Sequence, residues 1–185
     1  MSDPDSSTDW IGDEGSSEIR SWHASRDPYH AAFRMIRLLN HTKEKNFNLE
    51  HLYFLDFFLT FPFLLHRTHM RQDQRKRFNA MRIRRPKDYF MDVPSTPSLF
   101  RDMDPIQKTA ISWLAGVGII EREAFLVGEA HLVTTAVPSE LLHRAEERNQ
   151  VEQTLIDFIV NDFGGVSLSE LREMTGLRRR ILQWL

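Results

Sequence analysis

The stretch SLFRDMDPIQKTAISWLAGVGIIEREAFLVGEAHLVT, residues 98–134, decides how the rest of the chain is interpreted. Its first half is apolar at helical spacing, and Gly116-Val117-Gly118 follows as a helix stop. A β-like run over 119–127 and a returning strand at 130–134 predict a hairpin, with a turn at Gly128. A helix, a hairpin and a further helix are the order of a winged helix, so this region predicts a winged-helix-like module.

Two further helices are predicted before this stretch. The Asp-Pro pair at 27–28 is a good helix start, and the following residues form an apolar face from which Arg34 and Arg37 point away. A second helix starts at Asn48 and is broken by Pro62. Because it is apolar nearly all round, we expect it to be the central buried helix. Within 98–115, the Asp-Pro pair at 104–105 could start a helix in mid-segment.

The fold class predicted is mainly α with a small β-hairpin: a winged-helix-like domain with a long C-terminal helix. That long helix covers 140–163 and is ended by Gly164-Gly165. A shorter helix follows, capped by Ser167 or Ser169. Its sequence pattern is similar to the first helix and turn of a second helix-turn-helix. The domain organisation expected is a disordered acidic tail (1–24), a helical plus winged-helix-like domain (25–136), and a long helix with a partial helix-turn-helix-like segment (137–185).

Charge and composition predict a disordered N-terminal segment and a cytoplasmic protein. Residues 1–24 hold six acidic residues against Arg20, with many serines and glycines, which is typical of a disordered segment. The longest apolar stretch, 52–65, is too short and too broken to span a bilayer. The chain has no cysteine, which excludes disulfides and cysteine-ligated zinc. A cytoplasmic protein without a membrane partner is the expectation.

Residues 67–87 carry nine basic residues against one acid, Asp73. Such a density of cations can neutralise several phosphates in a salt-dependent and largely sequence-independent contact. The alternative is a solvated helix face paired to acids elsewhere in the chain. The residues predicted to contact nucleic acid are Arg71, Arg75, Lys76, Arg77, Arg82, Arg84, Arg85 and Lys87.

A second set of residues is predicted to contact protein partners. Asp56 is a carboxylate in the otherwise apolar helix that starts at Asn48, so it needs a partner. That partner would be an arginine of the basic segment, a helix-capping contact or a group on another protein. Aromatic residues in the acidic tail and near the C-terminus could order on a partner. The interface residues predicted on these grounds are Trp10, Trp22, Asp56, Arg178, Arg179 and Trp184.

No catalytic motif is found in the sequence. There is no phosphate-binding loop, no dinucleotide-binding turn, no nucleophile elbow and no His-Glu-x-x-His zinc motif. His66 and His69 have a spacing that a metal could use, but no nearby residues complete a ligand set. We therefore expect a protein that is not an enzyme and holds no metal or cofactor. An enzyme of an unrecognised kind, dependent on Asp56 or His66, is the weakest alternative.

Three phrases resemble a known family. They are DPYHAAFRMIRLL at 27–39, LYFLDFFL at 52–59 followed by Phe61-Pro62, and GVGIIE at 116–121. Together they resemble the middle components of ABC-three-component systems, whose best-known members are Lamassu-type antiphage and anti-plasmid systems. The resemblance covers roughly residues 27–135. It implies a non-catalytic accessory subunit that bridges an SMC-like ATPase with coiled-coil arms and an effector nuclease. It also implies double-stranded DNA as a sequence-nonspecific partner.

A free-standing winged-helix DNA-binding regulator is the main alternative. A regulator should place base-reading side chains on the helix before the wing. The segment 106–115 has only Lys108 as a cation, which is poor for readout of the major groove. The sequence therefore favours the accessory subunit over the regulator.

Overall fold

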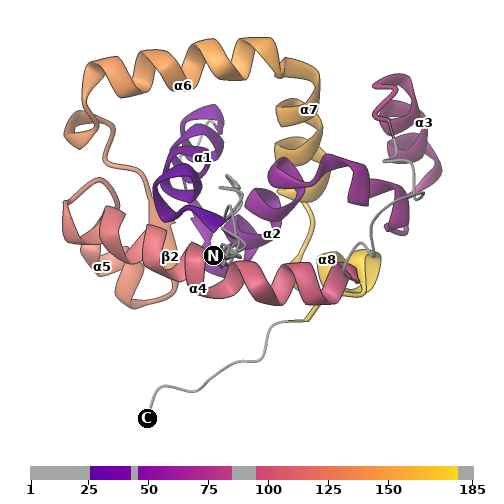
Figure 1. Cartoon of the computed structure of the whole chain (residues 1–185), viewed down its shortest axis with the longest axis horizontal. Helices are drawn as coiled ribbons and strands as arrows, with labels where there is room; N and C mark the ends of the chain where they lie inside the picture. Colours follow the sequence, from indigo (N-terminus) through magenta and orange to yellow (C-terminus); the bar gives the residue numbers. More distant parts are fainter. Residues whose placement is uncertain (1–25, 43–45, 85–94, 179–185) are drawn as a thin grey trace, which may run out of the picture.

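The computed structural model describes residues 26–42, 46–84 and 95–178. These residues form a mainly helical fold with one two-stranded antiparallel sheet, which confirms the prediction of a mainly α class with a small β element (Figure 1). None of the helices in the described ranges is both long enough and apolar enough to cross a membrane. The elements in chain order are α1 (Pro28–His41), β1 (Asn46–Asn48), α2 (Leu49–Thr60), the 3-10 helix η2 (Pro62–Arg67), α3 (Gln72–Ala80), α4 (Thr96–Gly116), α5 (Arg122–Leu126), β2 (Glu129–His131), the 3-10 turn η3 (Thr134–Ala136), α6 (Ser139–Val151), α7 (Gln153–Phe158), the π-helical turn η4 (Ile159–Phe163) and α8 (Leu168–Thr175).

Helix α2 is the central buried helix, as predicted. Every residue from 51 to 59 is buried, and the other helices surround it (Figure 1). The Asn48 side chain caps the helix by accepting from the backbone N–H of Glu50 at 3.0 Å. The helix ends at Thr60, before Pro62 begins η2. A side chain on any face of α2 therefore meets protein and not water.

Helix α1 begins as predicted, with the Asp27 carboxylate accepting from the N–H of Tyr29 at 2.8 Å. The expectation that Arg34 and Arg37 point away from the core is wrong, because both are buried. Helices α2, α4 and α6 all pack against α1, so no side of its middle is left to water. A long guanidinium side chain tolerates this position when its head group is paired.

The small sheet forms between segments that are far apart in the chain. Strand β2 appears where a returning strand was predicted, but it pairs antiparallel with β1, Phe47 opposite Ala130. The predicted first strand over 119–127 is wrong, since most of it forms α5, where Phe125 N–H donates to the Glu121 carbonyl at 3.0 Å. One isolated bridge, Ile120 to Leu132, joins the two segments of the expected hairpin. The helix-forming run Arg-Glu-Ala at 122–124 outweighs the β-like residues around it. The winged-helix assignment stays a prediction.

Helix α4 is continuous, so a helix start at Asp104-Pro105 is wrong. Ser95 caps the helix instead, accepting from Ser98 N–H at 3.3 Å, and Pro105 lies inside it. Proline costs the helix the hydrogen bond to the carbonyl four residues earlier. That carbonyl belongs to Arg101, an exposed residue, which leaves it open to water. The helix ends at Gly116 as predicted, and Gly118 adopts a φ of 79°.

The long helix predicted over 140–163 is interrupted at Glu152, where the backbone leaves the helical region with φ −107° and ψ 23°. Helix α7 then runs in a different direction from α6 (Figure 1). The Glu152 carboxylate accepts from Arg37 at 2.6 Å and from Arg148 at 2.5 Å. We attribute the interruption to the pairing with Arg37 of α1, a contact between distant segments that sequence periodicity does not contain.

The C-terminal helix α8 follows the prediction closely. Ser167 caps it by accepting from Glu170 N–H at 3.2 Å, and Gly176 ends it in the left-handed conformation, φ 66°. The predicted acidic tail, 1–24, lies outside the described residues, as do residues 179–185.

Candidate functional site

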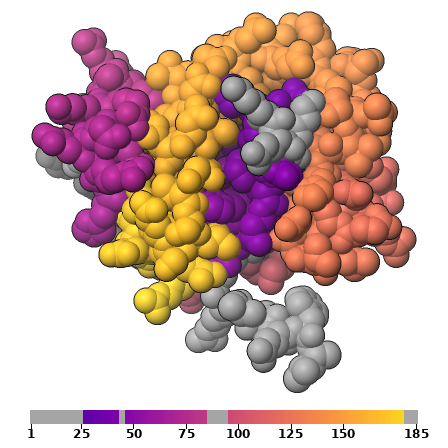
Figure 2. All heavy atoms as spheres, turned by 180° about the vertical axis from the view of Figure 1, so that it is seen from behind, coloured from indigo at the N-terminus to yellow at the C-terminus, as the bar shows by residue number. Residues whose placement is uncertain are grey.

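Helix α3 carries three of the eight predicted nucleic-acid contacts, Arg75, Lys76 and Arg77, and lies at one end of the molecule (Figure 1; magenta in Figure 2). Its inner face is formed by Gln74 and Phe78, both buried. The Phe78 ring lies 4.7 Å from the His66 ring and 5.9 Å from the Phe158 ring, between centroids. The helix is therefore anchored to η2 and α7 through one aromatic side chain.

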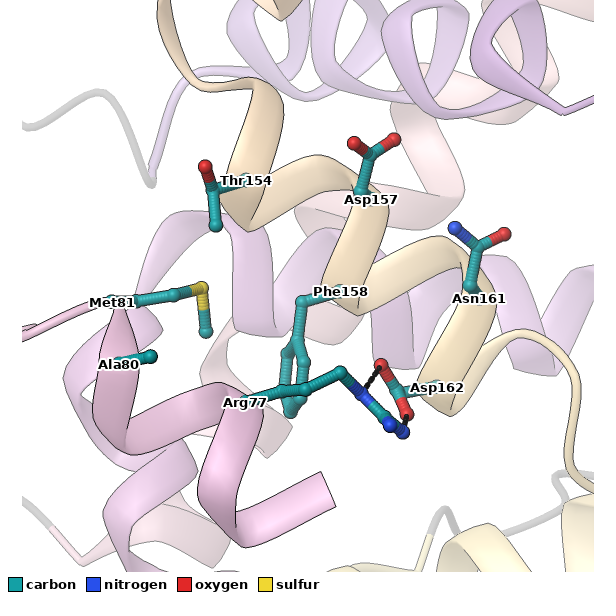
Figure 3. Close-up of a pocket in the computed structure, with 8 residues that line it drawn as sticks. All are labelled: Arg77, Ala80, Met81, Thr154, Asp157, Phe158, Asn161 and Asp162. Atoms are coloured by element: carbon teal, nitrogen blue, oxygen red, sulfur yellow. Dashed lines mark hydrogen bonds and ion pairs between the residues drawn. The ribbon is translucent and has the colours of Figure 1, made fainter. Parts of the chain in front are cut away.

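Polar contacts to η4 fix the same helix. Gln74 Nε2 donates to the Asp162 carbonyl at 3.0 Å, and its Oε1 accepts from Arg71 N–H at 3.0 Å. Arg77 forms a two-pronged ion pair with the Asp162 carboxylate and a second pair with Asp73 at 3.1 Å (Figure 3). The hydrogen bond with Asp162 raises the pKa of Arg77 above its ordinary value. Arg77 is thus held as part of the anchor.

Two other predicted cations on this segment are also engaged by the protein. Arg75 Nη2 donates to the Thr68 carbonyl at 2.5 Å, and its guanidinium lies 5.8 Å from the centroid of the Phe78 ring. Arg71 lies 3.9 Å from Glu170 of α8, a distance at which an exposed pair contributes little.

Arg67, the first cation of the segment, is exposed and donates to Thr96 Oγ1 at 3.2 Å. The remaining described cations, Lys76, Arg82 and Arg84, are exposed. Within the residues described here, none of the three forms an ion pair. Lys76 lies two residues from both Gln74 and Phe78, so it lies on roughly the opposite side of the helix from the anchor. Arg85 and Lys87 lie outside the described residues.

A groove of about 640 Å³ separates α3 from α7 and η4 (Figure 3). Arg77 and Asp162 pair across it, and Met81 and Phe158 give it an apolar wall. Its rim residue Asp157 is paired with His41, Nε2 to Oδ1 2.7 Å. The residues that line the groove are Arg77, Ala80, Met81, Thr154, Asp157, Phe158, Asn161 and Asp162.

Asp56 does not lie at a surface, which corrects its prediction as an interface residue. Its side chain is fully buried, and its carboxylate accepts from Arg34 Nε at 2.5 Å and from Gln107 Nε2 at 2.7 Å. The partner is Arg34 of α1 and not an arginine of the basic segment. The apolar helix around Asp56 indicated correctly that its carboxylate must have a partner. The identity of that partner could not be predicted from the sequence.

The His66 and His69 pair also separates in space. His66 Nε2 donates to the Ile83 carbonyl at 2.9 Å, while His69 is exposed and its backbone N–H donates to the Met174 carbonyl. Across the described ranges, no group of three or more His, Cys, Asp or Glu side chains is arranged to hold a metal ion.

An exposed aromatic pair was missed by the sequence reasoning. Tyr29 of α1 is 71% exposed and Trp113 of α4 is 44% exposed, with ring centroids 5.7 Å apart in an edge-to-face arrangement. Val117, one turn after Trp113, is also exposed. Both aromatics lie in segments that the sequence pattern predicts to be apolar helix faces, and periodicity cannot show that α1 and α4 leave them uncovered. Of the predicted interface residues, Arg178 is exposed, and Trp10, Trp22, Arg179 and Trp184 lie outside the described residues.

The fold and surface therefore define a mainly helical protein. Its cationic helix α3 is anchored at one end of the molecule, and an exposed aromatic pair lies on α1 and α4. The chain belongs to the family described as ABC-three component (ABC-3C) system Middle Component 5, which matches residues 20–180. The resemblance inferred from the sequence phrases is therefore confirmed at the level of the ABC-3C middle components. No curated protein and no solved structure matches the chain.

Proposed function

We propose that this chain is a docking subunit, without chemistry of its own, that bridges the SMC-like ATPase and the effector nuclease of a cytoplasmic, Lamassu-type antiphage system. Membership of a middle-component family supports an accessory role. The observation that carries the proposal is the Tyr29–Trp113 pair. Exposed aromatic side chains are typical anchors of protein interfaces because they bury a large area at little cost in conformational entropy.

The ATPase is the partner we propose for this aromatic pair. The side chains concerned, Tyr29, Trp113 and Val117, carry no charge and come from two packed helices. Such a surface fits an apolar helical stripe, as a coiled-coil arm would offer, better than it fits a charged ligand. The effector nuclease as the occupant is the outcome that would reassign this surface.

The same proposal includes a contact between helix α3 and double-stranded DNA. Its support is Lys76 on the outer side of α3 together with Arg82 and Arg84 just after the helix, all three exposed. The segment 106–115 of helix α4 offers a poorer reading surface, because its single cation, Lys108, is paired with Asp104 at 2.9 Å. This difference favours an accessory subunit over a free-standing winged-helix regulator, which would need free cations and base-reading groups on that helix.

The absence of catalysis is supported by the state of the two residues that an enzyme would most plausibly use. Asp56 is enclosed by Arg34 and Gln107, and His66 donates to a backbone carbonyl. The Asp56 carboxylate is thus closed to a substrate, and Nε2 of His66 is occupied by the protein itself. Turnover by the isolated chain that is lost on His66→Gln substitution would overturn this part of the proposal.

Co-purification with the products of the neighbouring genes tests the docking role. We expect the tagged chain to retain a coiled-coil ATPase, and Tyr29→Ser combined with Trp113→Ser to abolish that retention. The control is Val151→Ser, which removes a single exposed apolar side chain from α6. Retention of the ATPase by the double variant, or equal loss in the control, would contradict the proposed surface.

A further inference from the structure

We infer that α3 and the turn after it bind the phosphate backbone of double-stranded DNA through Lys76, Arg82 and Arg84, while Asp162 withholds Arg77 from that contact. The inference rests on the proposed DNA contact and divides the basic segment into cations that bind phosphate and cations that hold the helix.

The first step is the outward face of α3. Gln72, Lys76 and Asn79 are exposed and spaced i, i+4, i+7, so they share one side of the helix. The buried side, Gln74 and Phe78, has the same spacing and is offset by two residues. The outward face therefore combines one cation with two amide donors, a set suited to phosphate oxygens.

The second step is the chain turn after the helix. Arg82 has a φ of 51°, a left-handed conformation that a residue with a Cβ atom adopts at a cost. Its backbone N–H donates to the Asn79 carbonyl at 3.2 Å, so the turn folds back on the helix end. Arg82 and Arg84 are both exposed there. The turn thus places two cations beyond the end of a helix whose own outward cation is Lys76.

The third step is the exclusion of Arg77. Asp162 is mostly buried, with a side chain 10% exposed, and its two carboxylate oxygens accept from Nε and Nη2 of Arg77. A phosphate at this edge of the guanidinium would have to displace a carboxylate that the protein holds in place. Asp162 is therefore a positioning residue: it fixes α3 against η4 and keeps Arg77 from adding to the phosphate contacts.

The choice of a duplex follows from what the segment exposes. Proteins that bind single strands stack bases on aromatic side chains. Among the described residues of 67–84, the aromatic side chain of α3, Phe78, is buried in the anchor. Cations and amides without an exposed Phe, Tyr or Trp ring fit a sugar-phosphate backbone, where counterion release supplies the binding energy.

The test is the salt dependence of binding to a 20-base-pair duplex, measured by fluorescence anisotropy with the full chain and with the co-purified complex. Three phosphate contacts predict that affinity falls about 40-fold between 50 and 200 mM salt. Lys76→Gln, Arg84→Gln or Arg82→Gly each removes one contact, so we expect a fall of about 12-fold. Glycine suits the left-handed position 82, so that variant keeps the turn.

Two variants test the role of Asp162. Arg77→Gln should leave the salt dependence unchanged, because Arg77 makes no phosphate contact. Asp162→Ala leaves Arg77 only its exposed pair with Asp73, which water screens, so Arg77 becomes available to phosphate and the fall should steepen to about 150-fold, as four contacts would. Arg122→Gln and Glu123→Gln on α5 make the same charge changes at the opposite end of the molecule and should change nothing (Figure 1). Thermal unfolding checks that each variant is folded.

Three results would overturn the inference. Equal losses in Lys76→Gln and Arg122→Gln would mean that only net charge matters. A loss in Arg77→Gln as large as that in Lys76→Gln would remove the division between the cations. Absence of DNA binding by both chain and complex would overturn this inference and the proposed DNA contact together, whereas unchanged binding in the three α3 variants would overturn the inference alone.

Discussion

The chain holds two arginine–aspartate pairs that differ in their access to water. Arg34 and Asp56 join α1 to α2 with side chains 10% and 0% exposed, whereas Arg77 and Asp162 join α3 to η4 with side chains 53% and 10% exposed. The first pair is also bonded to Gln107 of α4, so three helices meet at one carboxylate. The second pair is open to solvent on the arginine side and to a groove (Figure 3).

The degree of burial of each ion pair determines how it contributes to the structure. A buried pair costs much desolvation and stabilises the fold mainly because breaking it leaves an unpaired charge in the core. A half-exposed pair is screened by water and fixes orientation more than stability. Burial also lowers the pKa of Arg37, one turn after Arg34, whereas the hydrogen bond with Asp162 raises the pKa of Arg77. The same chemistry thus holds the core in one place and orients a surface helix in the other.

The largest effect should come from Asp56→Ala. The substitution leaves Arg34 buried without its carboxylate, and we expect unfolding to become easier by about 3–5 kcal/mol. Urea unfolding followed by circular dichroism measures it. As a control, Arg34→Met combined with Asp56→Leu removes both charges and should recover most of the stability. A loss below about 1 kcal/mol for Asp56→Ala would show that the buried pair does not hold the three helices together.

The second effect concerns the support of the exposed pair. A Cβ atom on Gly164 would overlap the Val160 carbonyl oxygen and lie 3.1 Å from the Phe47 ring. Gly164→Ala should therefore strain η4, which carries Asp162, and destabilise the protein by about 1–3 kcal/mol. Hydrogen exchange should show faster opening of α3 in this variant.

The matched control for Gly164 is Gly116→Ala, where a Cβ atom meets nothing within 4 Å. Alanine is a better helix former than glycine, so we expect a gain of about 0.5–1 kcal/mol there. Equal stability of the two variants would show that the packing around η4 is not what sets the position of α3.

The smallest effect should be a pH dependence from His51. Burial lowers the pKa of His51, whose Nε2 lies 3.2 Å from the Phe163 carbonyl at the end of η4. The unfolded chain binds this proton more readily, so the fold should lose stability as the pH falls below about 6.5. Unfolding measured between pH 7.5 and 5.5 should show a weaker pH dependence in His51→Gln. The exposed His143→Gln is the control, and an identical pH dependence in all three proteins would refute the prediction.

Several features that depend only on residues close together in the sequence were predicted correctly. Asp27, Asn48 and Ser167 each cap the helix that follows, because a short polar side chain satisfies backbone N–H groups two or three residues away. The apolar run of α2 indicated burial on all sides, and Gly176 ends α8 in a left-handed conformation. Each of these signals depends only on neighbours within one helical turn.

Predictions that needed a distant partner failed or stayed open. The strand at 129–131 was expected to pair with its neighbour in sequence, yet it pairs with β1, about 80 residues earlier. Glu152 interrupts the long helix because it meets Arg37 of α1. The exposed pair Tyr29 and Trp113 looked like core residues because periodicity identifies an apolar face but not whether another element covers it.

The sequence by itself determined that the chain is mainly helical, that α2 is central and that 67–87 is basic, because these properties follow from composition and spacing. Its phrases also pointed to the middle components of ABC-3C systems, which the family match confirms. Only the tertiary structure decided which charged side chains are buried, held in ion pairs or exposed. Arg34 is buried by three helices, Arg77 is held by η4, and Lys76 is exposed, since pairing of a charge depends on groups that the fold brings from elsewhere in the chain.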